Sequence, residues 1–199
     1  MMDNHLRHIK WTMCLCYLDN IIAFFETFDD HLQRLRSVLK CIQDAGLVLN
    51  SKKGVFGSRQ IKILGHLLSQ ESIMLYPEKA RAVQNFPVPK NIRDARSFLG
   101  LCSYYRRFIK DFCLKAQPLQ ELLKNDSKFT WGSDQNESFE KLKRALTSEP
   151  VLGRFDERPP LSLHADANGY RVGATLVQIQ KRKEKVIAYA SRTLTKHEC

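Results

Sequence analysis

Two aspartates occupy positions from which a carboxylate could bind a divalent metal ion. Asp19 lies in the stretch CLCYLDNIIAFF, residues 14–25, where Asn20 follows it and apolar residues flank the pair. Asp166 lies in LHADANGYRVGATLVQ, just before a Gly-containing turn. Hard divalent cations prefer carboxylate oxygens, and a neutral amide is a weaker ligand. Each aspartate therefore has two interpretations, a metal ligand or a polar turn residue.

Basic residues are the second feature with a chemical consequence. Lys and Arg exceed Asp and Glu by 11 over the 199 residues of the chain. Eight of the basic residues fall within residues 81–115, where the acidic residues are Asp94 and Asp111. Such a local excess favours a polyanionic partner such as nucleic acid, and its alternative is a general surface charge that keeps the protein soluble.

The composition excludes several classes of protein. With 43% hydrophobic and 27% charged residues the chain is typical of a globular protein, and no apolar stretch approaches the ~18 residues of a membrane-spanning helix. The first twenty residues lack a signal-peptide cleavage pattern, so we expect an intracellular protein without a membrane partner. The six cysteines form no C-x-x-C pair, which predicts reduced thiols rather than a zinc site or disulfides.

The elements that must position these residues begin with a predicted hairpin. Residues 13–18 and 21–25 are two short apolar runs, and the Asp19-Asn20 pair between them suits a two-residue turn. Leucines then recur at helical spacing from Thr27, a predicted cap, to Gly46, a predicted stop. Residues 47–75 return to short runs broken by glycines, which predicts a small antiparallel set of strands.

Helices dominate the next part of the predicted fold. Pro77 suits the first position of one helix, and Asn91 can cap the next, whose apolar pattern continues to Ile109. A short helix is predicted from Pro118 to Lys124, and another follows with Ser133 as its cap. Three strands joined by turns complete the sequence, so the predicted fold class is α+β.

Several of these stretches, in this order, resemble one protein family. YLDNIIAFFETFDDHLQRLRSVLKCIQDAGLVLNSKK, KILGHLLS, RSFLGLCSYYRRFI, FTWGSDQNESFEKLKRALTSEPVL and HADANGYRVGATLVQ are similar to the Pol polyprotein of gypsy-class long-terminal-repeat retrotransposons. The resemblance implies the C-terminal part of a reverse transcriptase palm at 1–68, a helical thumb at 69–125 and a connection at 126–157. It implies the N-terminal, three-stranded part of an RNase H-like domain at 158–199.

The resemblance also implies roles for the two aspartates. Tyr17, Leu18, Asp19 and Asn20 stand where the family has its polymerase motif Tyr-x-Asp-Asp, and Asp166 stands where the family has the first RNase H carboxylate. Both family reactions use two Mg²⁺ ions, so Asp19 and Asp166 are the expected catalytic residues and metal ligands. The family's remaining carboxylates fall outside this sequence, and we therefore expect the chain to be catalytically incomplete alone.

Two further segments gain expected roles in holding nucleic acid. Leu64, Gly65 and His66 correspond to the family's primer grip, where a tight turn approaches the primer end. The thumb match FLGLCSYYRRFI would lie along a template–primer duplex or RNA–DNA hybrid and neutralise phosphates. Its helical pattern places Tyr105 in the core and leaves Tyr104 for contact. The expected nucleic-acid-binding residues are Arg96, Gly100, Ser103, Tyr104, Arg106, Arg107 and Lys110.

Two functions follow from the resemblance. The first is a part of an RNA-directed DNA polymerase with ribonuclease H, which uses deoxynucleoside triphosphates as an intact enzyme. The second is a non-catalytic module that keeps affinity for template–primer or hybrid. A supporting subunit for an intact polymerase is a third possibility, which no residue of the sequence favours.

Overall fold

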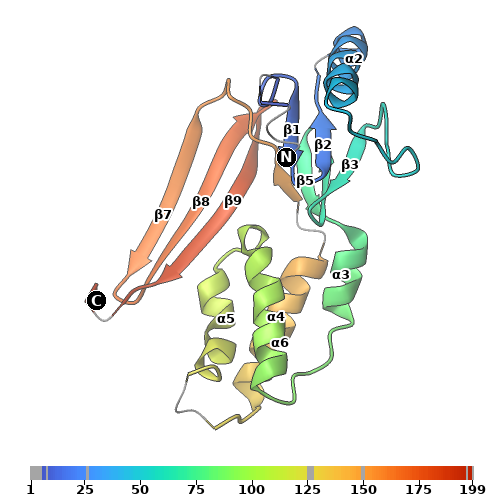
Figure 1. Cartoon of the computed structure of the whole chain (residues 1–199). Helices are drawn as coiled ribbons and strands as arrows, with labels where there is room; N and C mark the ends of the chain where they lie inside the picture. The colour runs from blue at the N-terminus through green and yellow to red at the C-terminus, as the bar shows by residue number, and fades with distance from the viewer. Residues whose placement is uncertain are drawn as a thin grey trace. The chain divides into compact units, whose positions relative to one another are not determined.

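A computed structural model of the chain describes residues 6–7, 9–25, 27–124, 128–148, 151–195 and 197–198 (Figure 1). The chain divides into two compact units, Met1–Ser58 and Arg59–Cys199. Both units combine helices with antiparallel strands, which confirms the predicted α+β class.

The first unit contains a two-stranded hairpin and a long helix. Strands β1 (Cys14–Tyr17) and β2 (Asn20–Ala23) pair antiparallel, and helix α2 (Phe28–Asp44) follows them. The Thr27 side chain accepts a hydrogen bond from the backbone N–H of Asp30 at 3.2 Å, which confirms the predicted cap. A small core holds the hairpin and the helix together; its buried members are Leu6, Ile9, Cys14, Val38 and Ile42.

The turn of this hairpin lies one residue earlier than predicted. Tyr17 pairs with Asn20, so the turn consists of Leu18 and Asp19, and Leu18 adopts a left-handed φ of 54°. In this register Cys14 of β1 is fully buried in the core. Burial of the inner strand face therefore outweighs the preference of Asn for the turn.

The second unit opens with a four-stranded antiparallel sheet. Its strands lie in the order β3 (Gln60–Ile63), β4 (His66–Ser69), β5 (Ser72–Leu75) and β6 (Val151–Gly153). The first three are the predicted strands, confined to the end of the stretch 47–75. Strand β6 was not predicted, because three residues are too few to show a period in the sequence.

Helices α3 (Pro77–Gln84) and α4 (Ile92–Tyr104) follow the sheet and begin as predicted. Pro77 occupies the first turn of α3, and the Asn91 side chain accepts from the backbone N–H of Asp94 at 2.9 Å at the start of α4. Helix α4 is shorter than its apolar pattern suggested. It ends at Tyr104.

The residues after α4 form a separate short element. A 3-10 helix, η1, spans Arg106–Phe108, and Ile109 is extended. Both Phe108 and Ile109 are nonetheless buried. The apolar pattern continues past α4 because these residues are buried, although they do not continue the α-helix. The predicted single helix to Ile109 was therefore wrong.

Helices α5 (Phe112–Glu121) and α6 (Ser133–Thr147) complete the helical part. Helix α5 begins well before Pro118, which lies inside it, so the predicted start at Pro118 was wrong. Pro118 has no backbone N–H, so the carbonyl of Leu114 does not receive the usual helical hydrogen bond from residue 118. Gly132 occupies the cap position of α6, so the predicted cap Ser133 is instead its first residue, and the Gly132 N–H donates to Oε1 of Gln135 at 3.1 Å.

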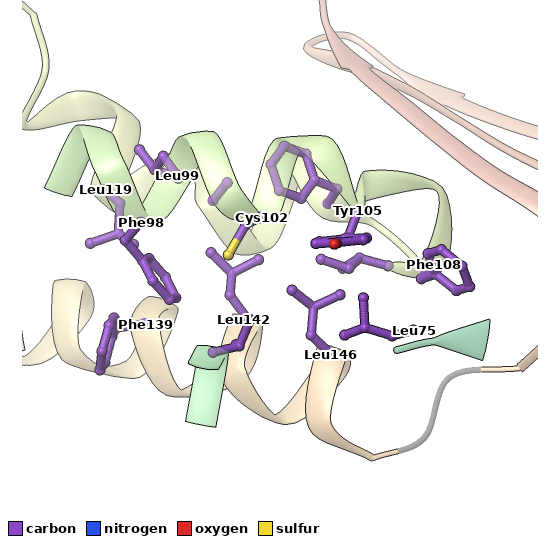
Figure 2. Packing of buried hydrophobic residues seen from close by; sticks show 14 of the residues in the cluster. Leu75, Phe98, Leu99, Cys102, Tyr105, Phe108, Leu119, Phe139, Leu142 and Leu146 are labelled. Carbon is purple, nitrogen blue, oxygen red and sulfur yellow. The ribbon is translucent and has the colours of Figure 1, made fainter. Parts of the chain in front are cut away.

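A single apolar core joins these helices to the sheet (Figure 2). Phe98 and Cys102 of α4 face Phe139 and Leu142 of α6, and the Phe98 and Phe139 rings lie 4.5 Å apart. All four side chains are fully buried. Burial also raises the pKa of the Cys102 thiol to about 12, so this cysteine is a core residue without nucleophilic character.

The three predicted C-terminal strands form an antiparallel sheet in the order β7 (Leu161–Asn168), β8 (Arg171–Gln180) and β9 (Lys183–Thr193). The β8–β9 turn consists of Lys181 and Arg182, which both have positive φ. Strands β8 and β9 contain a bulge, because Leu176 pairs with Ala188 and Val177 with Val186.

Gln178 of β8 binds the segment between β6 and β7 through three hydrogen bonds. The fully buried Gln178 amide donates to the carbonyls of Asp156 and Pro159 at 2.8 Å and accepts from the N–H of Asp156 at 3.0 Å. The segment from β6 to β7 is therefore held against β8, although it contains no helix or strand.

Neither membrane helices nor disulfides occur in the part of the chain that the structure describes. No helix there is long and apolar enough to cross a bilayer. The described cysteines are free thiols, and Cys199 lies outside the described residues; the free thiols are Cys14, Cys16, Cys41, Cys102 and Cys113.

Candidate nucleic-acid interface

The segment Tyr17–Asn20 forms an exposed hairpin tip. Tyr17 and Leu18 are 51% and 77% exposed, and Asp19 is exposed beside them. The Asn20 side chain donates from Nδ2 to Oδ1 of Asp19 at 3.3 Å. This tip therefore presents one carboxylate, with a neutral amide beside it.

Asp166 lies near the end of β7, where it pairs with Gly173 of β8. Its side chain is exposed, as are those of the other β7 residues. Two Mg²⁺ ions require several converging carboxylates. Within the described residues no group of three or more His, Cys, Asp or Glu side chains converges, so neither Asp19 nor Asp166 has the companions of a two-metal site there.

The predicted primer-grip residues lie at the tip of the β3–β4 hairpin. Leu64 and Gly65 form its two-residue turn with φ of 48° and 76°, and His66 is the first residue of β4. A Cβ on Gly65 would overlap the hydroxyl of Tyr105. A side chain at residue 65 would therefore require the Tyr105 hydroxyl to shift, and glycine lets the hairpin tip approach Tyr105 without that shift.

The structure brings this hairpin together with the predicted thumb residues. The Tyr104 hydroxyl donates to the Leu64 carbonyl at 2.9 Å, across 40 positions of sequence. The His66 ring stacks near Tyr104 at 6.0 Å and meets Tyr105 edge-on at 5.4 Å. Tyr104 remains 56% exposed, whereas Tyr105 is only 2% exposed, which confirms its predicted place in the core.

The surroundings of His66 at this contact favour the neutral form of its ring. Burial lowers the pKa of His66 below its ordinary value, and the nearby Arg107 guanidinium lowers this pKa further. The Nδ1 atom of His66 is buried without a hydrogen-bond partner in the described structure. His66 therefore acts here as an aromatic packing residue between the hairpin and the helix.

Three more predicted residues share one exposed face of α4. Arg96, Gly100 and Ser103 are spaced four and three residues apart, so they lie along one side of the helix, and all three are exposed. A Cβ on Gly100 would meet no atom within 4 Å. The face is therefore open for the backbone of a ligand to approach closely.

Arg106 and Arg107 lie in η1 rather than on α4, and both reach β9. An Nη2 atom of Arg106 donates to the Ser191 carbonyl, and Nη2 of Arg107 donates to the Ile187 carbonyl at 3.4 Å. Arg106 is exposed overall, and Arg107 is half-buried. Lys110 is exposed after η1, where its carbonyl accepts from the Lys115 ammonium.

Sequence reasoning missed the residues of β9 that receive these arginines. Ser191 is 9% exposed, and its hydroxyl accepts from the backbone N–H of Cys113 at 3.0 Å. A buried serine within an apolar strand pattern gives no signal of such a contact, and the bulge that turns Ile187 toward Arg107 has no mark in the sequence either.

Two family models match separate parts of the chain. Residues 1–68 match the family described as reverse transcriptase (RNA-dependent DNA polymerase). Residues 131–199 match the RNase H-like domain found in reverse transcriptase.

Curated relatives extend these matches over the whole chain. The chain is 34% identical to the retrovirus-related Pol polyprotein from transposon opus of Drosophila melanogaster, and the match covers 100% of this chain and 21% of the relative. It is also 34% identical to the Pol polyprotein from transposon gypsy of the same organism, over 99% of this chain and 20% of the relative. The chain thus spans about a fifth of the length of these relatives.

Solved structures show the same fold. A foamy viral protease–reverse transcriptase in complex with double-stranded DNA matches with a TM-score of 0.85 and 26% identity, over 98% of this chain and 34% of that one. The foamy viral protein in complex with an RNA/DNA hybrid matches with a TM-score of 0.82 and 27% identity, over 98% and 26%. Taken with the family matches and the relatives, these similarities place the chain in the gypsy-class retrotransposon Pol polyproteins, as the C-terminal region of the reverse transcriptase together with the RNase H-like domain.

Proposed function

We propose that this chain supplies the surface on which a retrotransposon RNA-directed DNA polymerase holds its template–primer. The surface consists of the α4 face of Arg96, Gly100 and Ser103, together with Tyr104 and the hairpin tip Leu64–His66. The hydrogen bond from Tyr104 to Leu64 carries this proposal, because it fastens the primer-grip hairpin to the thumb helix. Foamy viral relatives bound to double-stranded DNA and to RNA/DNA hybrid support it.

Charge and shape both suit a nucleic-acid duplex. The chain carries a formal net charge of +11, and Arg96, Tyr104 and Lys110 are all exposed. Phosphates are recognised by such side chains without regard to base sequence, and the open Gly100 admits a sugar–phosphate backbone. We propose template–primer duplex and RNA–DNA hybrid as ligands, and deoxynucleoside triphosphates as substrates of the intact enzyme.

Asp19 and Asp166 are proposed as Mg²⁺ ligands of that intact enzyme, for polymerisation and for hydrolysis of RNA in hybrids respectively. Each would contribute one carboxylate to a metal site whose other ligands are not among the described residues. We further propose domain boundaries near residues 68, 125 and 157, which separate palm, thumb, connection and RNase H-like domain.

Binding of a fluorescent RNA–DNA hybrid to the purified chain tests the holding surface. Anisotropy titrations over a series of salt concentrations should show affinity that falls steeply with salt. Arg96→Gln should reduce the slope of log affinity against log salt by about 0.7–0.9, the value for one phosphate contact. Arg182→Gln, on the β8–β9 turn, removes the same charge outside the surface and should leave the slope unchanged.

Catalysis is tested separately, by Mg²⁺-dependent primer extension with the same preparation. A chain that only holds the nucleic acid should bind hybrid and extend no primer. Extension that disappears in Asp19→Ala would show instead that this chain assembles a working polymerase site. Absence of hybrid binding at low salt would refute the proposed surface.

A further inference from the structure

Strand β9 is an edge strand of the C-terminal sheet, with β8 on one side and no strand on the other in the described structure. The outer edge of such a strand presents backbone carbonyl and N–H groups that need partners. The bulge adds to this need, because Ile187 is the extra residue and lies opposite no residue of β8.

The short helix η1 supplies donors to this edge. Arg106 donates to the carbonyl of Ser191, and Arg107 donates to the carbonyl of Ile187 at 3.4 Å. The two acceptors are four residues apart along β9 and therefore lie on one side of the strand. Two neighbouring arginines thus donate to two carbonyls of β9, one of which belongs to the bulge residue.

The arginines are themselves held in place by buried aromatic rings. The Arg106 guanidinium lies 5.5 Å from the centre of the Phe112 ring, and that of Arg107 lies 6.0 Å from the Phe108 ring. Phe108 and Phe112 are each 3% exposed. Each guanidinium therefore has a buried aromatic ring near it as well as its acceptor on β9.

Ser191 ties β9 to the next helix as well. Helix α5 begins after Asp111, whose side chain makes no capping hydrogen bond. The Ser191 hydroxyl accepts instead from the N–H of Cys113 in the first turn of α5, at 3.0 Å. One β9 residue therefore caps a helix through its side chain and receives Arg106 through its carbonyl.

We propose that these contacts form a joint, made of Arg106, Arg107, Cys113, Ile187 and Ser191, that fixes the RNase H-like sheet to the thumb. Phe108 of η1 also packs against His66 at 5.5 Å, so η1 lies between the hairpin tip and β9. Arg106, Arg107 and Ser191 are thus positioning residues. They set where Asp166 lies relative to the Leu64–His66 hairpin tip. This consequence for the two activities rests on the proposed function; the joint itself does not.

Hydrogen–deuterium exchange of the full chain tests the joint. Arg106→Gln/Arg107→Gln should speed exchange of the β9 amides by about tenfold or more, since charge-assisted hydrogen bonds are among the stronger ones. Ser191→Ala should speed exchange at the Cys113 N–H by a similar factor. Arg81→Gln/Arg93→Gln and Ser162→Ala make the same substitutions at exposed positions outside the joint and should leave both regions unchanged.

Hybrid binding by the same variants separates this role from phosphate contact. Faster β9 exchange with a wild-type salt slope in the double arginine variant supports the joint. Wild-type exchange in β9 together with a slope reduced by about 1.4–1.8, the value for two phosphates, overturns it. If the double variant does not fold, wild-type exchange at Cys113 in Ser191→Ala also overturns it. If the unaltered chain does not bind the hybrid, the proposed function is refuted. The exchange experiment still tests the joint in that case.

Discussion

Gly65 has two independent reasons to be glycine. Its φ of 76° lies in the left-handed region, and a Cβ there would overlap the Tyr105 hydroxyl. Gly46, at the end of α2, has a similar φ of 64° but open space around the corresponding Cβ position. The two glycines therefore allow the cost of backbone strain to be separated from the cost of the close approach.

We predict that Gly65→Ala lowers the free energy of unfolding by more than Gly46→Ala. The strain alone costs roughly 1–2 kcal/mol, and the overlap adds about 1–3 kcal/mol at residue 65. Urea unfolding of the two variants measures both values. Equal losses would mean that the hairpin tip does not press on Tyr105.

The lowered pKa of His66 predicts a dependence of stability on pH. A histidine whose pKa is lower in the folded than in the unfolded chain contributes stability that is fully present above its ordinary value of 6.5. This contribution is lost as the pH falls from 6.5 through the lower pKa of the folded state. Unfolding free energies at pH 8 and pH 5 should therefore differ less in His66→Gln than in the unaltered chain. An unchanged difference would show that another group titrates instead.

At the scale of elements, the second unit is built around one large apolar core, to which Phe139 of α6 belongs. Phe139 is fully buried and lies 4.5 Å from Phe98 and 5.8 Å from Trp131. We predict that Phe139→Ala lowers the unfolding free energy by about 3–5 kcal/mol, since it removes a large ring from a packed core. Phe155→Ala, at a position 47% exposed, is the control and should cost well under half as much. Similar losses would place the core elsewhere.

Elements with a local signal were predictable from the sequence. Thr27 and Asn91 begin helices as expected, because a cap is a contact between residues three apart. The expected apolar face of α6 is buried for the same reason, since helical spacing alone defines it.

Elements that depend on distant residues were not predictable. Helix α5 receives a cap from Ser191, and β6 completes a sheet whose other strands precede it by some eighty positions. The bulge at Ile187 likewise exists only once β8 and β9 pair. At the candidate site the residue types were predictable, whereas the contact between Tyr104 and Leu64 and the reach of Arg107 to β9 belong to the tertiary fold.

For the whole molecule, the division into two units predicts where a protease cuts. Residues 47–59 contain no helix or strand, and Lys52 and Lys53 are exposed within them. Backbone without packing or regular hydrogen bonds is cleaved before folded elements are. Limited trypsin digestion should therefore cut first at Lys52 or Lys53, as mass spectrometry of the fragments would show.

Lys143 provides the internal comparison for this experiment. It lies on α6, and its Nζ donates to the Phe86 carbonyl at 3.2 Å. Cleavage after Lys143 should appear only after the cut near residue 53. If cleavage within α6 comes first, the second unit unfolds locally before trypsin cuts the segment 47–59, and the prediction is wrong.

The cap that Ser191 places on α5 also sets an order of events during synthesis. Cys113 leaves the ribosome 78 residues ahead of Ser191. At roughly 5–20 residues per second, that interval lasts about 4–16 s. Throughout this time the first turn of α5 lacks its hydroxyl acceptor, so α5 matures only when β9 has been translated. This helix thus reaches its final form only after residues that are encoded much later in the chain.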